Sequence, residues 1–504
     1  MDYSKEDELI LKRHVSDLEK NVYLVYNLPP EVVAVLFAYV SRNPNSFRDN
    51  LLKLLKGKEL DAGKLIGTYS SEGIDFSQAS EKAKSFHEKW VVGYGHSSVA
   101  EHAVASIAFE NVSIIASKVI EDVRLASYTE KSTRYQIFDR NRYYKPKKIM
   151  DSSFAGLYEE TMNYLFDVYA EIIPGMIEFM KKEFPKPKEQ SEKAYDSATK
   201  ARACDVVRYI LPAGTLTNLA MTANARTLEW AISKFLSSPL EEMQEIGSSL
   251  KEEVKKIIPV LVKFADKNPY LMETEKALEE VISKQGLTDS EEKKEVELIE
   301  FDEDAEEKLI AALLYKYSNV SFNKAKEEAG KMSKKEKEKI IDESLKRLGP
   351  YDRPLRELEH LNYVFDILID YGAFRDIQRH RICTQTTQLL STSNGYSTPE
   401  EIVKAGFEKK FIECMEKAEK AYKKISKEFP IEAQYIVPLA YRKRTLFTWN
   451  LRELFHFIRL RSGREGHLSY RLLAMNLFDK INAVQPLLGK YLQVDKSLGP
   501  SRIK

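Results

Sequence analysis

The sequence predicts an α/β (α+β) protein made of two tandem copies of one domain. The first observation is a gapless internal match: residues 208–235 can be laid on residues 434–461, so that Asn450 lies 226 positions after Asn224. The second is the helical spacing of apolar residues over most segments. The third is an alternating pattern near the end of residues 103–109, which is typical of a strand. The chain is therefore an internal duplication.

Helical patterns account for most of the first half. The segments with helical spacing are 6–20, 32–40, 80–90, 113–123 and 152–184. Pro30 and Glu31 suit the first turn of the second of these helices, and Pro174 followed by Gly175 predicts a kink in the last. Between the copies, residues 272–304 are rich in Glu and Lys, with one glycine and Phe301 as the one aromatic residue. We expect copies at 1–271 and 305–504, joined by a solvated helical connector at 272–304.

Composition restricts the classes of partner. Lys and Arg number 78 against 77 Asp and Glu, a net charge of +1, so an anion site must be local. The near-neutral charge gives no reason to expect a nucleic-acid partner. A membrane partner is not expected either, since no apolar run approaches the roughly 20 residues that span a bilayer. The acidic start lacks signal-peptide character, which predicts a cytoplasmic protein. Three scattered cysteines exclude a disulfide framework, and the 31% charged residues resemble a thermophile proteome.

Two stretches could bind a phosphorylated ligand. Arg379-His380-Arg381 closes an apolar run and offers forked donors for a phosphate, although a solvated basic corner or a structural ion pair would look the same. Residues 124–135 alternate hydroxyls, one carboxylate and two guanidiniums, which suits a phosphorylated, hydroxyl-bearing ligand or a plain polar loop.

A third stretch combines histidines with small residues. It runs from Gly93 through His96, Ser98 and Glu101 to His102. Two histidines and a carboxylate could ligate a metal, but no further ligand is in view, so we expect no metal. A serine-rich turn before a helix start is equally suited to holding a cofactor.

These motifs resemble the flavin-dependent (ThyX) thymidylate synthases. The signature of that family is Arg-His-Arg, two residues, Ser, one residue, Asn-Glu, one residue, Ser, one residue, Arg. The second copy keeps the triplet Arg379-His380-Arg381 and loses the rest to Thr384, Thr386, Thr387, Leu389 and Ser391. The first copy has Asp122-Val123-Arg124 where the triplet belongs and Thr129 in place of Asn, but it keeps Ser127, Glu130, Ser132 and Arg134. The two defects are complementary.

Other family positions are divided in the same way. Arg208 matches a nucleotide-contacting arginine, and its counterpart is Gln434. Arg461 matches the arginine that polarises the pyrimidine, and its counterpart is Phe235. Relatives are homotetramers with composite sites between subunits, each domain being a small, mostly antiparallel sheet packed with long helices. The resemblance thus implies a homodimer of double-length chains that forms a pseudo-tetramer, in which one set of composite sites is complete.

The resemblance also implies a reaction and its residues. The reaction is reductive methylation of dUMP to dTMP with FAD as cofactor, and NADPH and methylenetetrahydrofolate as co-substrates. Arg461 would be the activating cation at the uracil. The residues that would bind the nucleotide are Arg379, Glu130, Ser132, Arg134 and Arg208. Those that would hold FAD are His96, Ser98, Glu101, His380, Arg381, Asn450, Arg452 and His456, with Asn224 and Arg226 as substitutes for Asn450 and Arg452.

Some residues depart from the family pattern and keep other functions open. Asp376 stands where relatives often place a polar substrate contact, and a carboxylate would repel a phosphate there. With Thr129, it favours a non-catalytic homologue that binds FAD or a nucleotide as a sensor or scaffold. Cys383 follows the cationic triplet, but the family uses no thiolate at this place. An RNA- or DNA-binding protein is disfavoured by the near-neutral net charge.

Overall fold

Each half of the chain forms a small sheet in which the strand from the repeated segment lies in the middle. In the computed structural model the first sheet has the order β1-β3-β2, formed by Val104–Ser113, Leu216–Asn224 and Ala126–Glu130. The second has the order β4-β5-β7-β6, formed by Val296–Phe301, Asn362–Asp370, Arg442–Asn450 and Cys383–Thr387. Apart from the extra edge strand β4, the two orders are the same, which confirms the predicted α/β fold with its small antiparallel sheets.

The two sheets also share one register. Ser127 of β2 is opposite Thr222 of β3, and Thr384 of β6 is opposite Thr448 of β7. These are the residues that the sequence alignment makes equivalent. The strands that carry the divided signature therefore occupy the same place in both copies.

The structure describes residues 3–40, 44–56, 97–287 and 293–497, and they fall into two compact units. The first unit contains Met1–Val112, Val119–Glu130 and Thr217–Leu287, with the sheet of the first copy. The second contains Ser113–Lys118, Lys131–Leu216 and Thr288–Lys504. The second unit thus combines the sheet of the second copy with the helical middle of the first. None of the described helices is long and apolar enough to cross a membrane.

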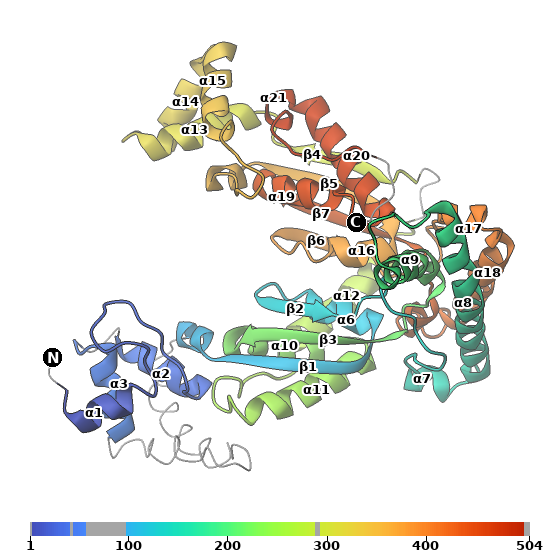
Figure 1. Ribbon diagram of the computed structural model, residues 1–504, viewed down its shortest axis with the longest axis horizontal. Helices are drawn as coiled ribbons and strands as arrows, with labels where there is room; N and C mark the ends of the chain where they lie inside the picture. Colours follow the sequence, from blue (N-terminus) through green and yellow to red (C-terminus); the bar gives the residue numbers. More distant parts are fainter. Residues whose placement is uncertain (1–2, 41–43, 57–96, 288–292, 498–504) are drawn as a thin grey trace. The chain divides into compact units, whose positions relative to one another are not determined.

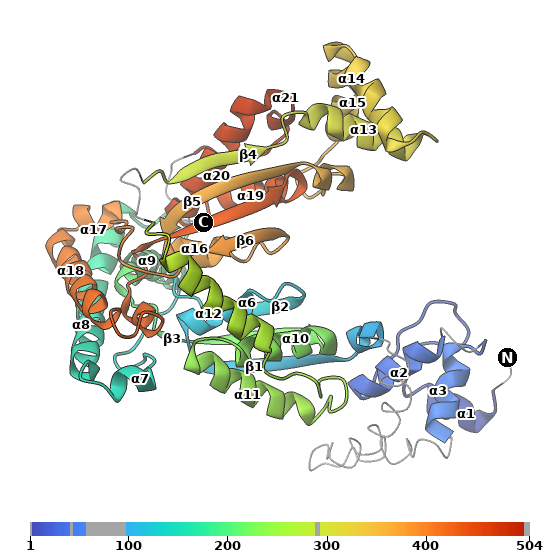
Figure 2. The same cartoon turned by 180° about the vertical axis from the view of Figure 1, so that it is seen from behind.

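Helices α10 and α11 lie beside the sheet of the first unit in both views (Figures 1 and 2). The described helices of this unit are α1 Lys5–Leu11, α2 Pro30–Val40, α3 Phe47–Lys56, the 3-10 helix η2 Ser97–His102, α10 Ala225–Leu236, α11 Glu241–Lys255 and α12 Pro269–Ser283. Helix α6, Ile114–Glu121, passes from the second unit to the first.

In the second unit, α19 and α20 pack on the strands of the sheet, and α8 lies beside α18 (Figure 2). The helices from the first copy are α7 Lys147–Met150, α8 Ala155–Glu183, α9 Glu192–Val207 and η3 Arg208–Ile210. Those from the second copy are α13 Ala305–Tyr317, α14 Phe322–Lys331, α15 Lys334–Leu345, η4 Arg356–His360, α16 Tyr371–Ile377, α17 Glu400–Lys404, α18 Glu408–Ile425, η5 Glu432–Ile436, α19 Leu451–Ser462, α20 Leu468–Val484 and α21 Pro486–Gly489.

Two expected helices differ from the structure. The helix expected at 6–20 ends at Leu11, because the chain then turns back and Val15 forms a β-bridge with Val25. The expected helical connector is helical only up to Ser283, and Val296–Phe301 is strand β4. Its alternating Val296 and Leu298 suit a strand, and the register shifts between Leu298 and Glu300. Helix α8 contains Pro174 and runs on to Glu183. The helix expected at 80–90 lies outside the described residues.

The two copies pack on each other in the second unit through reciprocal backbone hydrogen bonds. Ala213 N donates to Val437 O at 2.8 Å, and Leu439 N donates to Leu211 O at 2.9 Å. The two bonds are equivalent, because Ala213 aligns with Leu439 and Leu211 aligns with Val437. Pro212 and Pro438, which also align, form a β-bridge between the two bonds. Such a self-complementary contact is what an isologous dimer interface becomes when its two subunits are joined in one chain.

Candidate functional site

A cluster of charged side chains lies in the second unit where elements of both copies meet. Arg134 follows β2, Asp205 lies in the last turn of α9 and Arg208 begins η3. The second copy contributes Arg375 and Asp376 from α16, Arg379 just after it and Arg461 from the last turn of α19. We call these seven residues the arginine cluster. Arg208 and Arg375 are almost fully buried, whereas the Arg379 side chain is 42% exposed, so the cluster is open on one side.

Asp205 holds the two arginines of the first copy. Arg134 donates through Nε and Nη2 to the two carboxylate oxygens at 2.8 and 2.9 Å, a bidentate pair. Arg208 Nε lies 3.2 Å from Asp205 Oδ1. Burial raises the pKa of Asp205, but His467, Arg208 and Arg134 outweigh it and leave that pKa below its usual value. Asp205 is therefore ionised at neutral pH.

The contacts Arg134–Tyr470 and Arg375–Thr133 connect the copies at this cluster, and contacts within each copy hold the same side chains. Arg134 Nη1 donates to the Tyr470 hydroxyl at 3.1 Å, and the Arg461 guanidinium lies 5.3 Å from the centre of the same ring. Arg208 and Arg375 each donate to the Thr133 hydroxyl at 3.3 Å. The arginine that ends the signature in the first copy and the arginine assigned to the pyrimidine in the second thus share one tyrosine.

The arginine cluster brings several guanidiniums close to two carboxylates. The carboxylates are those of Asp205 and Asp376, and guanidiniums of the cluster lower the pKa of both. Burial raises the pKa of Asp376, but Arg208, Arg379, Arg461 and Arg134 together bring it below its usual value. Arg208 is 2% exposed, and its Nη2 has no hydrogen-bond partner among the described residues. A buried cation with an unused donor is costly unless an anion completes it, so the cluster is suited to a phosphate.

His380 connects Arg461 to a carboxylate. Arg461 Nε donates to His380 Nε2 at 2.9 Å, so that nitrogen must present its lone pair. The proton of the neutral ring is then on Nδ1, which is 2.9 Å from Glu453 Oε1. Burial and the neighbouring Arg461 lower the pKa of His380 to about 3. Arg461 Nη2 also donates to Asp376 O at 2.6 Å, which fixes the guanidinium from a second side.

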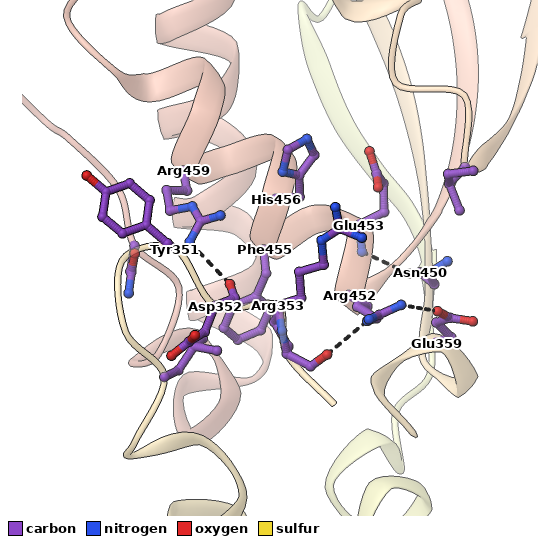
Figure 3. Close-up of a pocket in the computed structure, with 14 residues that line it drawn as sticks. Tyr351, Asp352, Arg353, Glu359, Asn450, Arg452, Glu453, Phe455, His456 and Arg459 are labelled. Atoms are coloured by element: carbon purple, nitrogen blue, oxygen red, sulfur yellow. Dashed lines mark hydrogen bonds and ion pairs between the residues drawn. The ribbon is translucent and has the colours of Figure 1, made fainter. Parts of the chain in front are cut away.

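Glu453 also lines a cavity of about 440 Å³ in the second unit (Figure 3). The cavity walls come from the loop before η4, from η4, from Ile382, from Asn450 and α19, and from Gln493. The polar lining residues are Asp352, Arg353, Glu359, Asn450, Arg452, Glu453, His456, Arg459 and Gln493, and the other lining residues are Leu348, Tyr351, Pro354, Ile382 and Phe455. Such a volume with a mixed lining is typical of a small-molecule site.

Two arginines of α19 hold the loop that forms one wall. Arg452 ion-pairs with Glu359 at 2.6 Å and donates to Pro354 O at 2.9 Å. Arg459 donates to Pro350 O at 2.6 Å, and Figure 3 shows it reaching the main chain at Asp352 as well. Asn450 caps α19 by accepting a hydrogen bond from Glu453 N at 2.9 Å. Asn450 and Arg452, which were predicted to hold FAD, therefore also have structural partners.

The remaining predicted residues lie elsewhere in the described chain. Ser132 is next to the cluster in sequence, and its hydroxyl accepts a hydrogen bond from Arg134 N at 3.2 Å. Arg381 is half-buried and does not line the cavity. The predicted residues of the first unit are Ser98, Glu101, Glu130, Asn224 and Arg226. Arg226 pairs with Glu101 at 2.5 Å, as Arg452 pairs with Glu359. His96 lies outside the described residues.

Sequence reasoning missed several residues of these sites. Asp205, Thr133 and Tyr470 contact the arginines, and Glu453 lies behind His380. Asp205 precedes Arg208 by three positions on one helical face, which is a usable signal. The Cys383 thiol is buried and donates to His380 O at 2.9 Å.

In comparison with known proteins, the same family model matches two separate parts of the chain. The model of the thymidylate synthase complementing protein family matches residues 62–260 and 297–487. A UPF0159 protein of Chlamydia pneumoniae is 35% identical and covers 96% of this chain and 94% of its own. A UPF0159 protein of Thermoplasma acidophilum is 31% identical, with 85% and 94% covered. The flavin-dependent thymidylate synthase of Clostridium tetani is 29% identical over 39% of this chain and 77% of its own.

Proposed function

Because the chain belongs to the thymidylate synthase complementing protein family, we propose that it is a flavin-dependent thymidylate synthase that methylates dUMP to dTMP. When bound, FAD supplies a hydride after reduction by NADPH, and methylenetetrahydrofolate supplies the carbon. The chain's own residues bind the nucleotide, orient the pyrimidine and stabilise charge. No protein nucleophile is needed for these tasks, so positioning and electrostatics carry the catalysis.

The observation that carries this proposal is the arginine cluster, in which Arg134 from the signature of the first copy lies with Arg379 from the triplet of the second. In it, Arg134 and Arg208 lie with Arg379 and Arg461. Arg208 offers an unused buried donor to the dUMP phosphate, and Arg134 and Arg379 add charge around it. Glu130 and Ser132 would contact the sugar side of the nucleotide. The phosphate would accept charge-assisted hydrogen bonds from these guanidiniums.

Arg461 is the residue to which we assign the catalytic role. His380 and Asp376 O hold its guanidinium in place through two hydrogen bonds. A cation that is fixed before the reaction costs no reorganisation when negative charge develops on the pyrimidine. The cluster thus gives each arginine a separate task, binding for Arg134 and Arg208 and charge stabilisation for Arg461.

The cavity fits part of a flavin nucleotide. Its guanidiniums Arg353, Arg452 and Arg459 suit a pyrophosphate, and Ile382 and Phe455 give it an apolar side for a ring. Asn450, Arg452 and His456 would then hold FAD from the cavity, with His380 and Arg381 beside it. We also assign FAD contacts to His96, Ser98 and Glu101, as the family signature implies. We further propose a cytoplasmic homodimer of double-length chains.

A second candidate is binding without turnover, as a nucleotide or flavin sensor or scaffold. Asp376 favours it, because an ionised carboxylate lies inside the cluster that would receive the phosphate. The four arginines that lower the pKa of Asp376 weigh against this candidate, since they offset its charge.

Two measurements test the proposal in sequence. The purified protein should show the absorption bands of an oxidised flavin, and with dUMP, NADPH and methylenetetrahydrofolate it should form dTMP. The matched control is Arg347→Gln, which removes an exposed guanidinium paired with Glu343 on α15. A flavin-loaded sample that binds dUMP and forms no dTMP would establish the second candidate instead.

A further inference from the structure

Glu453 is a largely buried carboxylate, with its side chain 13% exposed, and the proposed function leaves it without a role. It lies at the third position of α19, where its backbone N–H is capped by Asn450. Its side chain lines the cavity and lies 2.9 Å from His380 Nδ1. It therefore lines the cavity, and the His380 imidazole connects it to Arg461.

The chemistry of Arg461 and Glu453 determines which nitrogen of His380 donates and which accepts. A guanidinium Nε–H can only donate, so His380 Nε2 can only accept from Arg461. The imidazole proton then has to be on Nδ1, and Glu453 Oε1 is its acceptor. The opposite tautomer would point an N–H of His380 at the N–H of Arg461 and remove the acceptor that holds the guanidinium.

We propose that Glu453 is a positioning residue that fixes the Nδ1–H tautomer of His380 and thereby the orientation of Arg461. This inference rests on the proposed function for the reaction that it serves. Because Glu453 also lines the cavity, it connects the cofactor site to the cation at the pyrimidine through two hydrogen bonds. A carboxylate that orients a histidine in this way typically affects rate more than ground-state binding.

The charged surroundings of Glu453 support the assignment. Burial raises its pKa to about 7, and His456 and Arg452 on the same helix oppose that shift. Glu359 of η4 pairs with Arg452 at the cavity wall, and Arg461 lies on the far side of His380. Glu453 is ionised above about pH 7, where it is the stronger acceptor for the Nδ1–H. We therefore expect turnover to rise as the pH increases through 7.

The test compares Glu453→Gln with Glu453→Ala in the full-length, flavin-loaded protein. Glutamine keeps an oxygen for the His380 Nδ1–H, so kcat should stay within about 3-fold of wild type. It also removes the ionisable group, so the rise of turnover through pH 7 should disappear. Alanine removes the acceptor, and kcat should fall about 10- to 100-fold while KM for dUMP changes less than about 3-fold. The control is Glu416→Ala, which removes an exposed partner of Lys420.

A readout independent of turnover completes the test. In protein labelled with ¹⁵N-histidine, the spectrum of His380 should show a protonated Nδ1 and an unprotonated Nε2 in wild type and in Glu453→Gln, and a change of tautomer in Glu453→Ala. An unchanged tautomer in Glu453→Ala, or an equal loss of kcat in both variants, would overturn the inference. Absence of dTMP from wild type would overturn the proposed function alone, because the spectra do not depend on turnover.

Discussion

Arg461 and Phe235 occupy equivalent positions of the two copies and have opposite surroundings. Phe235 is fully buried among apolar residues of α10 and the first unit. Arg461 lies in the last turn of α19, with His380, Asp376 O and Tyr470 around its guanidinium. A buried cation costs free energy unless such partners surround it. The first copy therefore uses this position for packing, whereas the second maintains a charge there.

Arg208 and Gln434 differ in the same sense. Gln434 is buried and satisfied within its own copy, since its Oε1 accepts from Leu390 N at 3.0 Å and its Nε2 donates to Ile431 O at 3.0 Å. Arg208 is equally buried, but its Nη2 has no hydrogen-bond partner in the described chain. The hydrogen-bonding groups of the Gln434 amide are satisfied within the chain, whereas the Arg208 guanidinium keeps a donor that a ligand could use.

The largest effects should come from truncating Arg461 and its counterpart Phe235 to alanine. Arg461→Ala should lower kcat for dTMP formation by about 10²- to 10³-fold, because a fixed cation at developing charge is lost. Phe235→Ala should instead lower the free energy of unfolding by about 3–5 kcal/mol and leave the kcat of the folded protein near wild type. Steady-state kinetics and urea denaturation of both variants measure the two effects. Turnover within 3-fold of wild type in Arg461→Ala would contradict the comparison.

The carboxylate of the cluster should have the next largest effect. Asp205→Asn leaves Arg134 and Arg208 without their counter-charge and should cost about 3 kcal/mol of unfolding free energy at pH 7. The pKa of Asp205 is lowered in the folded state, so its stabilisation is complete above the usual carboxyl pKa of 3.8. That stabilisation is lost as the pH falls from there through the lower folded pKa.

Denaturation at several pH values should therefore show the wild type and Asp205→Asn converging below about pH 4. At the equivalent place of the second copy stands Ile431, which cannot titrate. A difference that stays constant from pH 7 to pH 3 would show that the charge of Asp205 contributes nothing.

Arg208→Gln, which introduces the residue of the other copy, should weaken dUMP binding about 10- to 100-fold, as expected for losing a charged hydrogen bond. Deoxyuridine, which lacks the phosphate, should bind equally to wild type and variant. Calorimetry with both ligands measures this, and Arg347→Gln provides an exposed arginine as control. Equal weakening for both ligands would place Arg208 at the sugar or base rather than at the phosphate.

The smallest effects should come from the ion pair that both copies keep. The side chains of Arg226 and Glu101 are 55% and 48% exposed, and those of Arg452 and Glu359 are 30% and 31% exposed. Glu101→Gln should change the unfolding free energy by less than about 0.5 kcal/mol, and Glu359→Gln by about 1 kcal/mol. Thermal unfolding at low and high salt tests the order, and a reversed order would mean that exposure does not decide the strength of these pairs.

The repeated segment explains why much of this fold could be predicted from the sequence. Asn224 and Asn450 cap equivalent helices, and the strands before them are the central strands of their sheets. The divided signature also predicted that Arg134 and Arg461 share a site, which is a proposal that their common contact with Tyr470 supports. These features follow from local patterns or from equivalence between the copies.

The rest depends on contacts between distant residues that carry no local signal. Glu453 reaches His380 across 73 positions, and Arg134 reaches Asp205 across 71. The loop from Leu348 to Pro354 follows a helical insertion that the alignment does not cover, yet it forms a wall of the cavity. Strand β4 falls within the predicted connector, because Glu and Lys dominate the composition of that segment and hide the short strand pattern.

The reciprocal hydrogen bonds around Pro212 and Pro438 have a consequence for behaviour on dilution. Separate subunits that pair through such a contact come apart when their concentration falls below the dissociation constant. Two copies in one chain keep an effective concentration in the millimolar range however few molecules are present. The arginines of the first copy and those of the second therefore stay together in a single molecule, even where the protein is scarce.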